Sequence, residues 1–259
     1  MFHDTLKMVT EYLENDTEVQ SQYIKDLGDE SVYRSQLAQM YEALAANAMT
    51  SLLRARHEYA GAAPADAQQK AARDERETEL KKLHQQYMVK TQNEKRFDEY
   101  IYIIKGFWSL FVDGDLSGAD RQFQIVHSKA VRADATREQK TYICSASIGL
   151  GICLYAEGKY QQALEHFAKA IQANPACPPS VRVAVASCCF KLGQFGKARL
   201  AANVAVEMDP TQADAFCMLA LIEQADAVKD RTKRREHLLA ANDYWVVRAG
   251  SLGHVSCIV

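Results

Sequence analysis

This chain has seven cysteines and seven histidines, whose side chains could ligate a metal ion or attack a substrate. Zinc sites usually bring their ligands together in short pairs such as Cys-x-x-Cys or Cys-x-x-x-His. Neither pair occurs, and the histidines are scattered along the chain without ligand spacing. An odd number of cysteines without a secretory leader indicates reduced thiols in an intracellular compartment. We therefore expect neither a metal site nor a cofactor.

Two local patterns could still suggest catalysis. Gly149-Leu150-Gly151 has two of the three glycines of a dinucleotide-binding turn, but no strand precedes it, so we interpret it as close helix packing. The adjacent Cys188 and Cys189 lack a basic sequence neighbour that would activate a thiol, and we expect them to be small buried residues. No Ser/His/Asp set or carboxylate pair stands out. The chain is therefore predicted not to be an enzyme.

The composition predicts a mostly helical globular protein. Of 259 residues, 48% are hydrophobic and 25% charged, which excludes a wholly disordered chain and fits one or two domains. The chain has only 12 glycines and 5 prolines, which argues against an all-β fold with frequent turns. Lys+Arg 31 nearly balance Asp+Glu 33, so we expect no attraction to an anionic membrane and no direct binding of nucleic acid.

Residues 1–99 are predicted to form a helical region with polar joints. Apolar residues at steps of three and four predict one helix before residue 15 and another from near Ser31. The polar stretch 15–28 between them is expected to hold a joint. Asp66 is expected to cap a charged helix that ends near Asn93. We expect its outer face to be solvated, with a coiled-coil contact as the alternative.

A repeated signature follows, in which a glycine turn precedes a large apolar residue, a small residue and a core residue. It recurs as Gly114-x-Leu116-x-x-Ala119-x-x-x-Phe123, Gly158-x-Tyr160-x-x-Ala163-x-x-x-Phe167 and Gly193-x-Phe195-x-x-Ala198-x-x-x-Ala202. The alanine lets two antiparallel helices approach closely, and Pro175 and Pro210, 35 residues apart, end two successive units. This period and pattern are those of the tetratricopeptide repeat.

We predict an all-α fold, a right-handed helical solenoid of tetratricopeptide repeats preceded by long N-terminal helices. The solenoid is expected to span residues 100–245, and residues 246–259 are expected to form an irregular tail. Its units are predicted near 100–133, 144–177 and 179–212, with a degenerate unit at 213–245.

In such a solenoid the first helix of each unit lines a concave groove. The residues expected to face it are mostly apolar and aromatic: Ile101, Ile104, Trp108, Phe111, Ile148, Ile152, Tyr155, Val183 and Phe190, with Lys191 near the edge. We hypothesise that a helical or extended apolar segment of a partner covers them, with the four aromatic residues as binding hot spots. The alternative, with equal weight, is that the chain's own N-terminal helices fill the groove or that some of these residues are inter-repeat core.

Two other kinds of binding were considered for this chain. The predicted groove lacks the Lys, Asn and Arg side chains with which chaperone adaptors grip a carboxylate tail, so that class is excluded. The basic cluster at 229–235 could serve nuclear import or touch nucleic acid, or it could be a solvated loop and helix start.

Several stretches resemble the tetratricopeptide scaffold subunit of the polymerase-associated factor complex. The resemblance rests on Asn174-Pro175-Ala176-Cys177-Pro178-Pro179-Ser180-Val181-Arg182, Cys189-Phe190-Lys191-Leu192, Lys197-Ala198-Arg199-Leu200-Ala201 and Gly114-Asp115-Leu116. It implies a nuclear, non-catalytic scaffold in RNA polymerase II transcription elongation on chromatin, whose N-terminal repeats hold a helical segment of another subunit. Family members are much longer than this chain. We therefore predict a protein–protein scaffold of the elongation complex, with an adaptor of another intracellular assembly, of trafficking or ubiquitin-ligase type, as the alternative.

Overall fold

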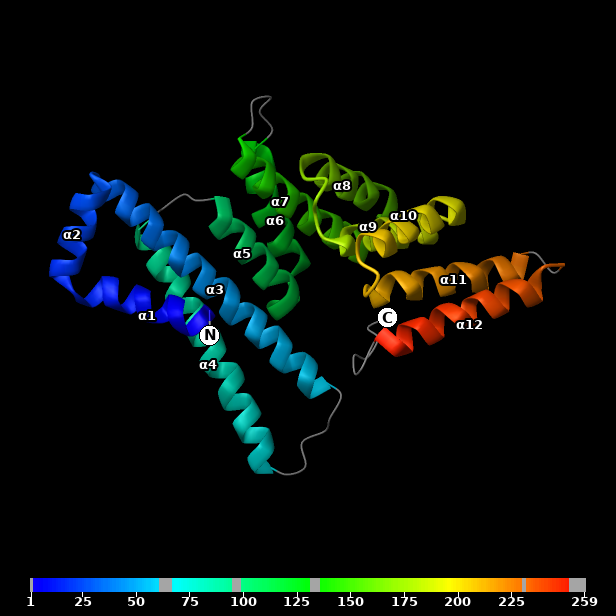
Figure 1. The fold of residues 1–259 in the computed structure, drawn as a ribbon, viewed down its shortest axis with the longest axis horizontal. Coiled ribbons are helices and arrows are strands. Elements are labelled where there is room, and N and C mark those ends of the chain that lie inside the picture. Colours follow the sequence, from blue (N-terminus) through cyan, green and yellow to red (C-terminus); the bar gives the residue numbers. More distant parts are fainter. Residues whose placement is uncertain (1, 61–66, 95–98, 131–135, 230–231, 252–259) are drawn as a thin grey trace. The chain divides into compact units, whose positions relative to one another are not determined.

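The computed structural model describes residues 2–60, 67–94, 99–130, 136–229 and 232–251 (Figure 1). Within these ranges all regular secondary structure is helical, with twelve α-helices, one π-helix and no strand. The predicted all-α class is therefore confirmed. The chain divides into two compact units, Met1–Gln122 and Phe123–Val259. Within the same described ranges, no helix has the length and apolar character needed to cross a membrane.

The N-terminal unit is dominated by one long helix pair, α3 and α4, which lie against each other (Figure 1). Two shorter helices precede the pair, and α5 and a single π-helical turn follow it. The elements of this unit are α1 (Phe2–Asn15), α2 (Thr17–Leu27), α3 (Glu30–Ala60), α4 (Ala67–Glu94), α5 (Glu99–Trp108) and η1 (Ser109–Asp113).

The joint expected within 15–28 falls at the two ends of this stretch, at Asp16 and Gly28, because the residues between them form the helix α2. Caps at both ends stabilise this largely polar helix, and three of its apolar residues pack against the core of the unit. The Asp16 side chain accepts hydrogen bonds from the backbone N–H groups of Glu18 and Val19, at 3.0 and 3.1 Å. At the other end Gly28, with φ of 74°, donates its N–H to the carbonyl oxygen of Ile24.

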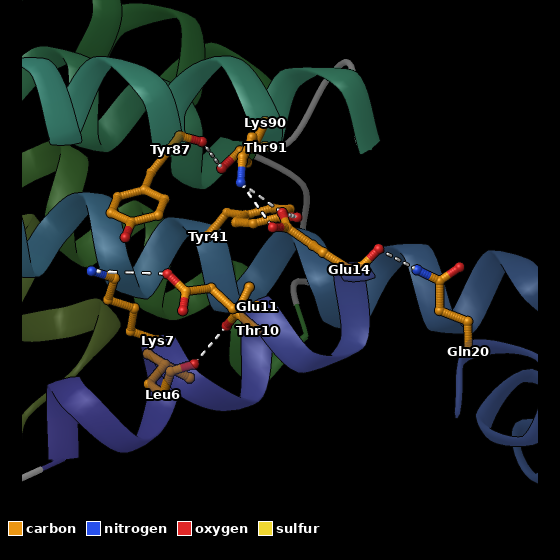
Figure 2. Close-up of polar contacts among 10 residues, drawn as sticks. All are labelled: Leu6, Lys7, Thr10, Glu11, Glu14, Gln20, Tyr41, Tyr87, Lys90 and Thr91. Atoms are coloured by element: carbon orange, nitrogen blue, oxygen red, sulfur yellow. Dashed lines mark hydrogen bonds and ion pairs between the residues drawn. The ribbon is translucent and has the colours of Figure 1, made fainter. Parts of the chain in front are cut away.

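A polar contact holds α1 on the long pair. Figure 2 shows Glu14 of α1 between Tyr41 of α3 and Lys90 of α4. The Lys90 ammonium lies 2.8 and 2.9 Å from the two carboxylate oxygens of Glu14, and the Tyr41 hydroxyl donates to the same carboxylate. Cavities of about 220 and 380 Å³ are both lined by these three residues. Packing under α1 is thus partly polar and incomplete.

The apolar core of the N-terminal unit joins α3, α4 and α5. Ile101 and Ile104 of α5 are each only 2% exposed and belong to this core. The core also contains Tyr33, Leu37, Tyr41, Leu44, Ala45, Tyr87 and Met88. Because α5 packs on the long pair, the boundary between the units falls after Gln122 and not near residue 100, where the repeats were expected to begin.

The C-terminal unit is built from antiparallel helix pairs that follow one another in sequence (Figure 1). Helix α9 contacts α8, α10 and α11, and α10 also contacts α11, so each pair packs on the next. The helices are α7 (Arg137–Ala156), α8 (Tyr160–Ala173), α9 (Pro179–Lys191), α10 (Phe195–Met208), α11 (Ala213–Lys229) and α12 (Arg234–Ser251). Helix α6 (Leu116–Ala130) contains the boundary between the two units.

Small residues allow these helices to approach closely. Ala163 and Ala198, the small residues of the repeated signature, are fully buried. A side chain added at Gly149 would lie 2.4 Å from the ring of Phe123, and one at Gly151 would lie 2.6 Å from the ring of Phe167. The interpretation of Gly149-Leu150-Gly151 as helix packing is confirmed, since each glycine makes room for a buried phenylalanine.

The turns and linkers of the repeats have a fixed geometry. Gly158 and Gly193 close the turns within two successive pairs at φ of 78° and 72°, a conformation that favours glycine. Between the pairs, Arg182 of α9 donates to the carbonyl oxygens of Pro175 and Cys177, at 2.6 and 3.0 Å. The guanidinium therefore ties the linker to the helix that follows it.

The last helix pair is longer than expected. Helix α12 reaches Ser251, so the first part of the predicted irregular tail, 246–251, is helical. Residues 252–259 lie outside the described residues. The same holds for Asp66, the expected helix cap, and for Asp230 and Arg231 of the basic cluster.

Candidate partner-binding surface

The predicted groove residues divide between the two units. Those of the C-terminal unit lie on α7 and α9, the first helices of two successive pairs. We call this set the first-helix surface, and it consists of Ile148, Ile152, Tyr155, Val183, Phe190 and Lys191.

The four predicted residues of the N-terminal unit do not share one environment. Ile101 and Ile104 are buried in the core against α3, so their side chains are not open to a partner, and the expectation for them is wrong. The alternative, cover by the chain's own helices, describes these two. Trp108 stacks on His84 of α4, with ring centroids 3.8 Å apart. Phe111 lies in η1 and is 46% exposed.

The His84–Trp108 stack is anchored inside the unit. His84 is 5% exposed, and its Nδ1 lies 2.9 Å from the carbonyl oxygen of Ala45. Burial lowers the pKa of His84, which favours the neutral imidazole. Trp108 therefore has an internal partner, and its role as a hot spot stays a prediction.

On the first-helix surface, two aromatic pairs occupy equivalent places, 35 residues apart. Tyr155 and Tyr160 face each other across the turn at Gly158, with ring centroids 5.1 Å apart. Phe190 and Phe195 do the same across the next turn, at 5.2 Å. Tyr155 and Phe190 are partly buried, so each ring combines an internal contact with an accessible part. Burial raises the pKa of Tyr155, which therefore stays a neutral hydrogen-bonding group.

The aliphatic members of the surface are less accessible. Ile148 and Ile152 are partly buried against the core between α7, α8 and α9. Val183 is 9% exposed and packs in the next core with Met218 of α11. Lys191 is exposed at the end of α9. The surface thus combines partly buried apolar groups, the buried Val183 and one exposed cation, which suits contact with an apolar peptide segment better than chemistry.

Five cysteines of this unit are buried, and Cys217 is partly buried. Cys188 and Cys189 are 0% and 2% exposed, which confirms that they are small buried residues. Burial raises the pKa of Cys144 to about 11 and that of Cys188 to about 12, so both remain thiols at neutral pH. No group of three or more His, Cys, Asp or Glu side chains that could hold a metal ion occurs among the described residues.

One charged cluster was missed by the sequence analysis. Glu223 of α11 is 6% exposed and accepts hydrogen bonds from Arg199 of α10 and from Nδ1 of His237 of α12, the latter at 2.6 Å. Arg199 also donates to Asp226 at 2.7 Å. Burial by itself would raise the pKa of Glu223, but the two hydrogen bonds outweigh it and hold this pKa below its ordinary value. The cluster joins three helices.

The only signal of this cluster in the sequence is a carboxylate directly after the apolar run 215–222. A helix-period pattern would place Glu223 at the edge of the buried face. Its partners Arg199 and His237 lie 24 and 14 residues away, so no local spacing identifies them.

Comparison with known proteins agrees with this architecture. Residues 154–222 match the family model of the tetratricopeptide repeat. The helix pairs of this region have the fold of a tetratricopeptide-repeat solenoid. The predicted fold class is thereby confirmed, and this fold is generally a non-catalytic scaffold for protein–protein interactions.

Two individual matches give further context for the chain. A protein CTR9 homolog from Arabidopsis thaliana is 27% identical over 112 residues, which cover 43% of this chain and 10% of that protein. The matched segment is therefore a small part of the relative. Among solved structures, the MamA D159K mutant 1 aligns with a TM-score of 0.42 at 16% identity, over 70% of this chain and 90% of that one.

Proposed function

We propose that this chain is a non-catalytic scaffold of the RNA polymerase II-associated elongation complex. Two observations support this specific assignment. The linker and helix at 174–182 resemble the corresponding segment of the repeat subunit of that complex, and 112 residues are 27% identical to the CTR9 homolog. The proposal places the chain in the nucleus, with protein subunits of the elongation complex as its partners.

The binding site in this proposal is the first-helix surface. The main observation in favour of this surface is a pair of equivalent aromatic contacts at the same place in two successive repeats, Tyr155–Tyr160 and Phe190–Phe195. Half-covered aromatic rings lose little conformational entropy on binding and contribute much apolar area. We propose that an apolar helical or extended segment of a partner subunit lies across these rings, with Lys191 near an acidic group at its end.

The test is affinity purification of the tagged chain from nuclear extract, followed by identification of the proteins that co-purify. We expect elongation-complex subunits with the natural chain and a loss of at least tenfold with the variant Tyr155→Ala/Lys191→Glu. Lys169→Glu, on the exposed outer face of α8, is the matched control and should retain them. Thermal unfolding of each variant checks that the fold is intact.

The outcomes separate the two parts of the proposal. Recovery of an unrelated assembly, still lost with the double variant, would keep the binding surface and refute the role in elongation. A trafficking or ubiquitin-ligase assembly would then be the partner. Recovery that is unchanged by the double variant would refute the first-helix surface.

A further inference from the structure

The outer face of α10 differs from the equivalent face of the preceding repeat. Leu200, Val204 and Met208 are spaced four residues apart and are 68%, 42% and 41% exposed. We call these three residues the α10 stripe. Residues four apart lie on one face of a helix, so the stripe is a continuous apolar ridge.

The repeat itself supplies the comparison. Displaced by the 35-residue period, Leu200 corresponds to Glu165 of α8 and Val204 to Lys169, both of which are exposed. The solenoid fold therefore accepts charged side chains at these positions. The packing of the repeat does not require apolar residues there, and a cover from outside the repeat explains their exposed parts better.

The charges around the α10 stripe indicate what this cover is. Lys197 is exposed near the N-terminal end of α10, and Glu207 is exposed near its C-terminal end. Gly196 also lies on the exposed face, and a side chain added there would meet no atom within 4 Å. The face thus has a cation at one end, an anion at the other and an apolar ridge between them. Beside the cation, Gly196 leaves room for a side chain of another molecule.

Such a face is complementary to itself. When two copies of α10 lie antiparallel, Lys197 of each copy faces Glu207 of the other, and each Met208 lies toward the other Gly196. The apolar ridges then meet between the two charge pairs. In a two-fold symmetric interface every contact is made twice, so one complementary pair becomes two. Ridges of residues four apart also pack well against each other.

We propose that the outer face of α10 is a self-association surface, and that its occupant is a second copy of this chain, bound antiparallel. This role goes beyond the scaffold function proposed above and uses none of the residues of the first-helix surface. A single helix face is small for an interface, so the dimer forms reversibly as the concentration rises.

The experiment is sedimentation velocity of the purified chain over a wide range of concentrations. We expect a monomer–dimer equilibrium for the natural chain. Leu200→Glu should raise the dissociation constant at least tenfold, because it places two carboxylates in the apolar part of the interface. Glu165→Lys, at the equivalent place on α8, is the matched control and should leave the dissociation constant unchanged.

Charge reversal tests the antiparallel arrangement. Lys197→Glu alone and Glu207→Lys alone should each weaken the dimer about fivefold, because each creates like-charge pairs. A mixture of the two variants should form a heterodimer more tightly than either variant dimerises alone, since both charge pairs are then restored across the interface. Thermal unfolding should be the same for all variants, because none of these side chains is buried.

Two results would overturn the proposal. A natural chain that is monomeric at every concentration would show that something other than a second copy covers the stripe. A dimer that survives Leu200→Glu, or charge-reversed variants that gain nothing on mixing, would show that self-association uses a different surface.

Discussion

The two units of this protein are stabilised in different ways. The C-terminal unit repeats one packing solution, in which glycine or alanine makes room for a buried phenylalanine or a neighbouring helix. The N-terminal unit has one apolar core, but its first helix is held by a polar contact of Glu14 with Tyr41 and Lys90. We therefore expect a core substitution to destabilise all the repeats together. In the N-terminal unit, by contrast, α1 can unfold locally while the other helices stay folded.

The largest effect is expected for Phe167→Ala in the C-terminal unit. Phe167 is 2% exposed and fills the space beside Gly151, so its removal leaves a cavity and should cost about 3–5 kcal/mol of unfolding free energy. Chemical denaturation followed by circular dichroism measures this. Phe111→Ala, at a site that is 46% exposed, is the matched control and should cost about 1 kcal/mol or less. Equal losses at both sites would contradict the proposed difference between core and surface.

The next effect concerns the charged cluster of α10, α11 and α12. Glu223→Gln removes the charge that faces Arg199 and His237, and we expect a loss of about 2–3 kcal/mol. Glu207→Gln, an exposed glutamate on α10, should change the stability by about 0.5 kcal/mol or less. If both variants unfold at the same denaturant concentration, the cluster does not hold the last three helices together.

The same cluster predicts a dependence of stability on pH. The pKa of Glu223 is lower in the folded chain than its ordinary value, so its contribution to stability is complete above the ordinary glutamate range. It should decline as the pH falls from about 5 through the lower, folded pKa. Melting temperatures measured across this range should fall more steeply for the natural chain than for Glu223→Gln. Parallel curves would show that Glu223 titrates with the same pKa in both states.

The smallest global effect is expected in the N-terminal unit. Lys90→Ala breaks the contact with Glu14 but leaves the apolar core of the unit intact, so the global loss should be about 1 kcal/mol or less. The local effect is larger, because amide hydrogen exchange in α1 should become faster while exchange in α3 stays slow. Lys7→Ala, whose ammonium lies 3.8 Å from Glu11 in an exposed ion pair within α1, is the control. Faster exchange in both helices would mean that α1 is part of one cooperative unit with α3.

The repeats could be predicted from the sequence because their signature involves residues close together in the sequence and occurs more than once. Gly158 and Gly193 mark turns, and Ala163 and Ala198 follow them at the same distance, so one repeat supports the next. The glycines of Gly149-Leu150-Gly151 were also interpreted correctly, since they fall in the first helix of a unit. Helical periodicity shows which residues share the face of a helix that packs against its neighbour.

The rest could not be predicted because it depends on contacts between distant residues. Helix α2 has few apolar residues, and its formation depends on the caps at Asp16 and Gly28 and on packing of Val19, Ile24 and Leu27 against the distant core. Ile101 and Ile104 fit a groove position by their spacing, but they are buried by α3, which lies more than 40 residues earlier. The partner-binding role of Tyr155 and Phe190 stays a prediction, since the structure gives their internal contacts alone.

The hydrogen bonds of Arg182 bear on how a chain of this kind can change in length. One guanidinium holds both carbonyl oxygens of a linker, at Pro175 and Cys177, so an inserted residue would pull at least one of them out of reach. A duplicated or deleted segment of one whole 35-residue period would instead bring its own turn, linker and clamp with it. A change in length by a complete repeat therefore preserves the geometry of each linker, whereas a change by a single residue does not.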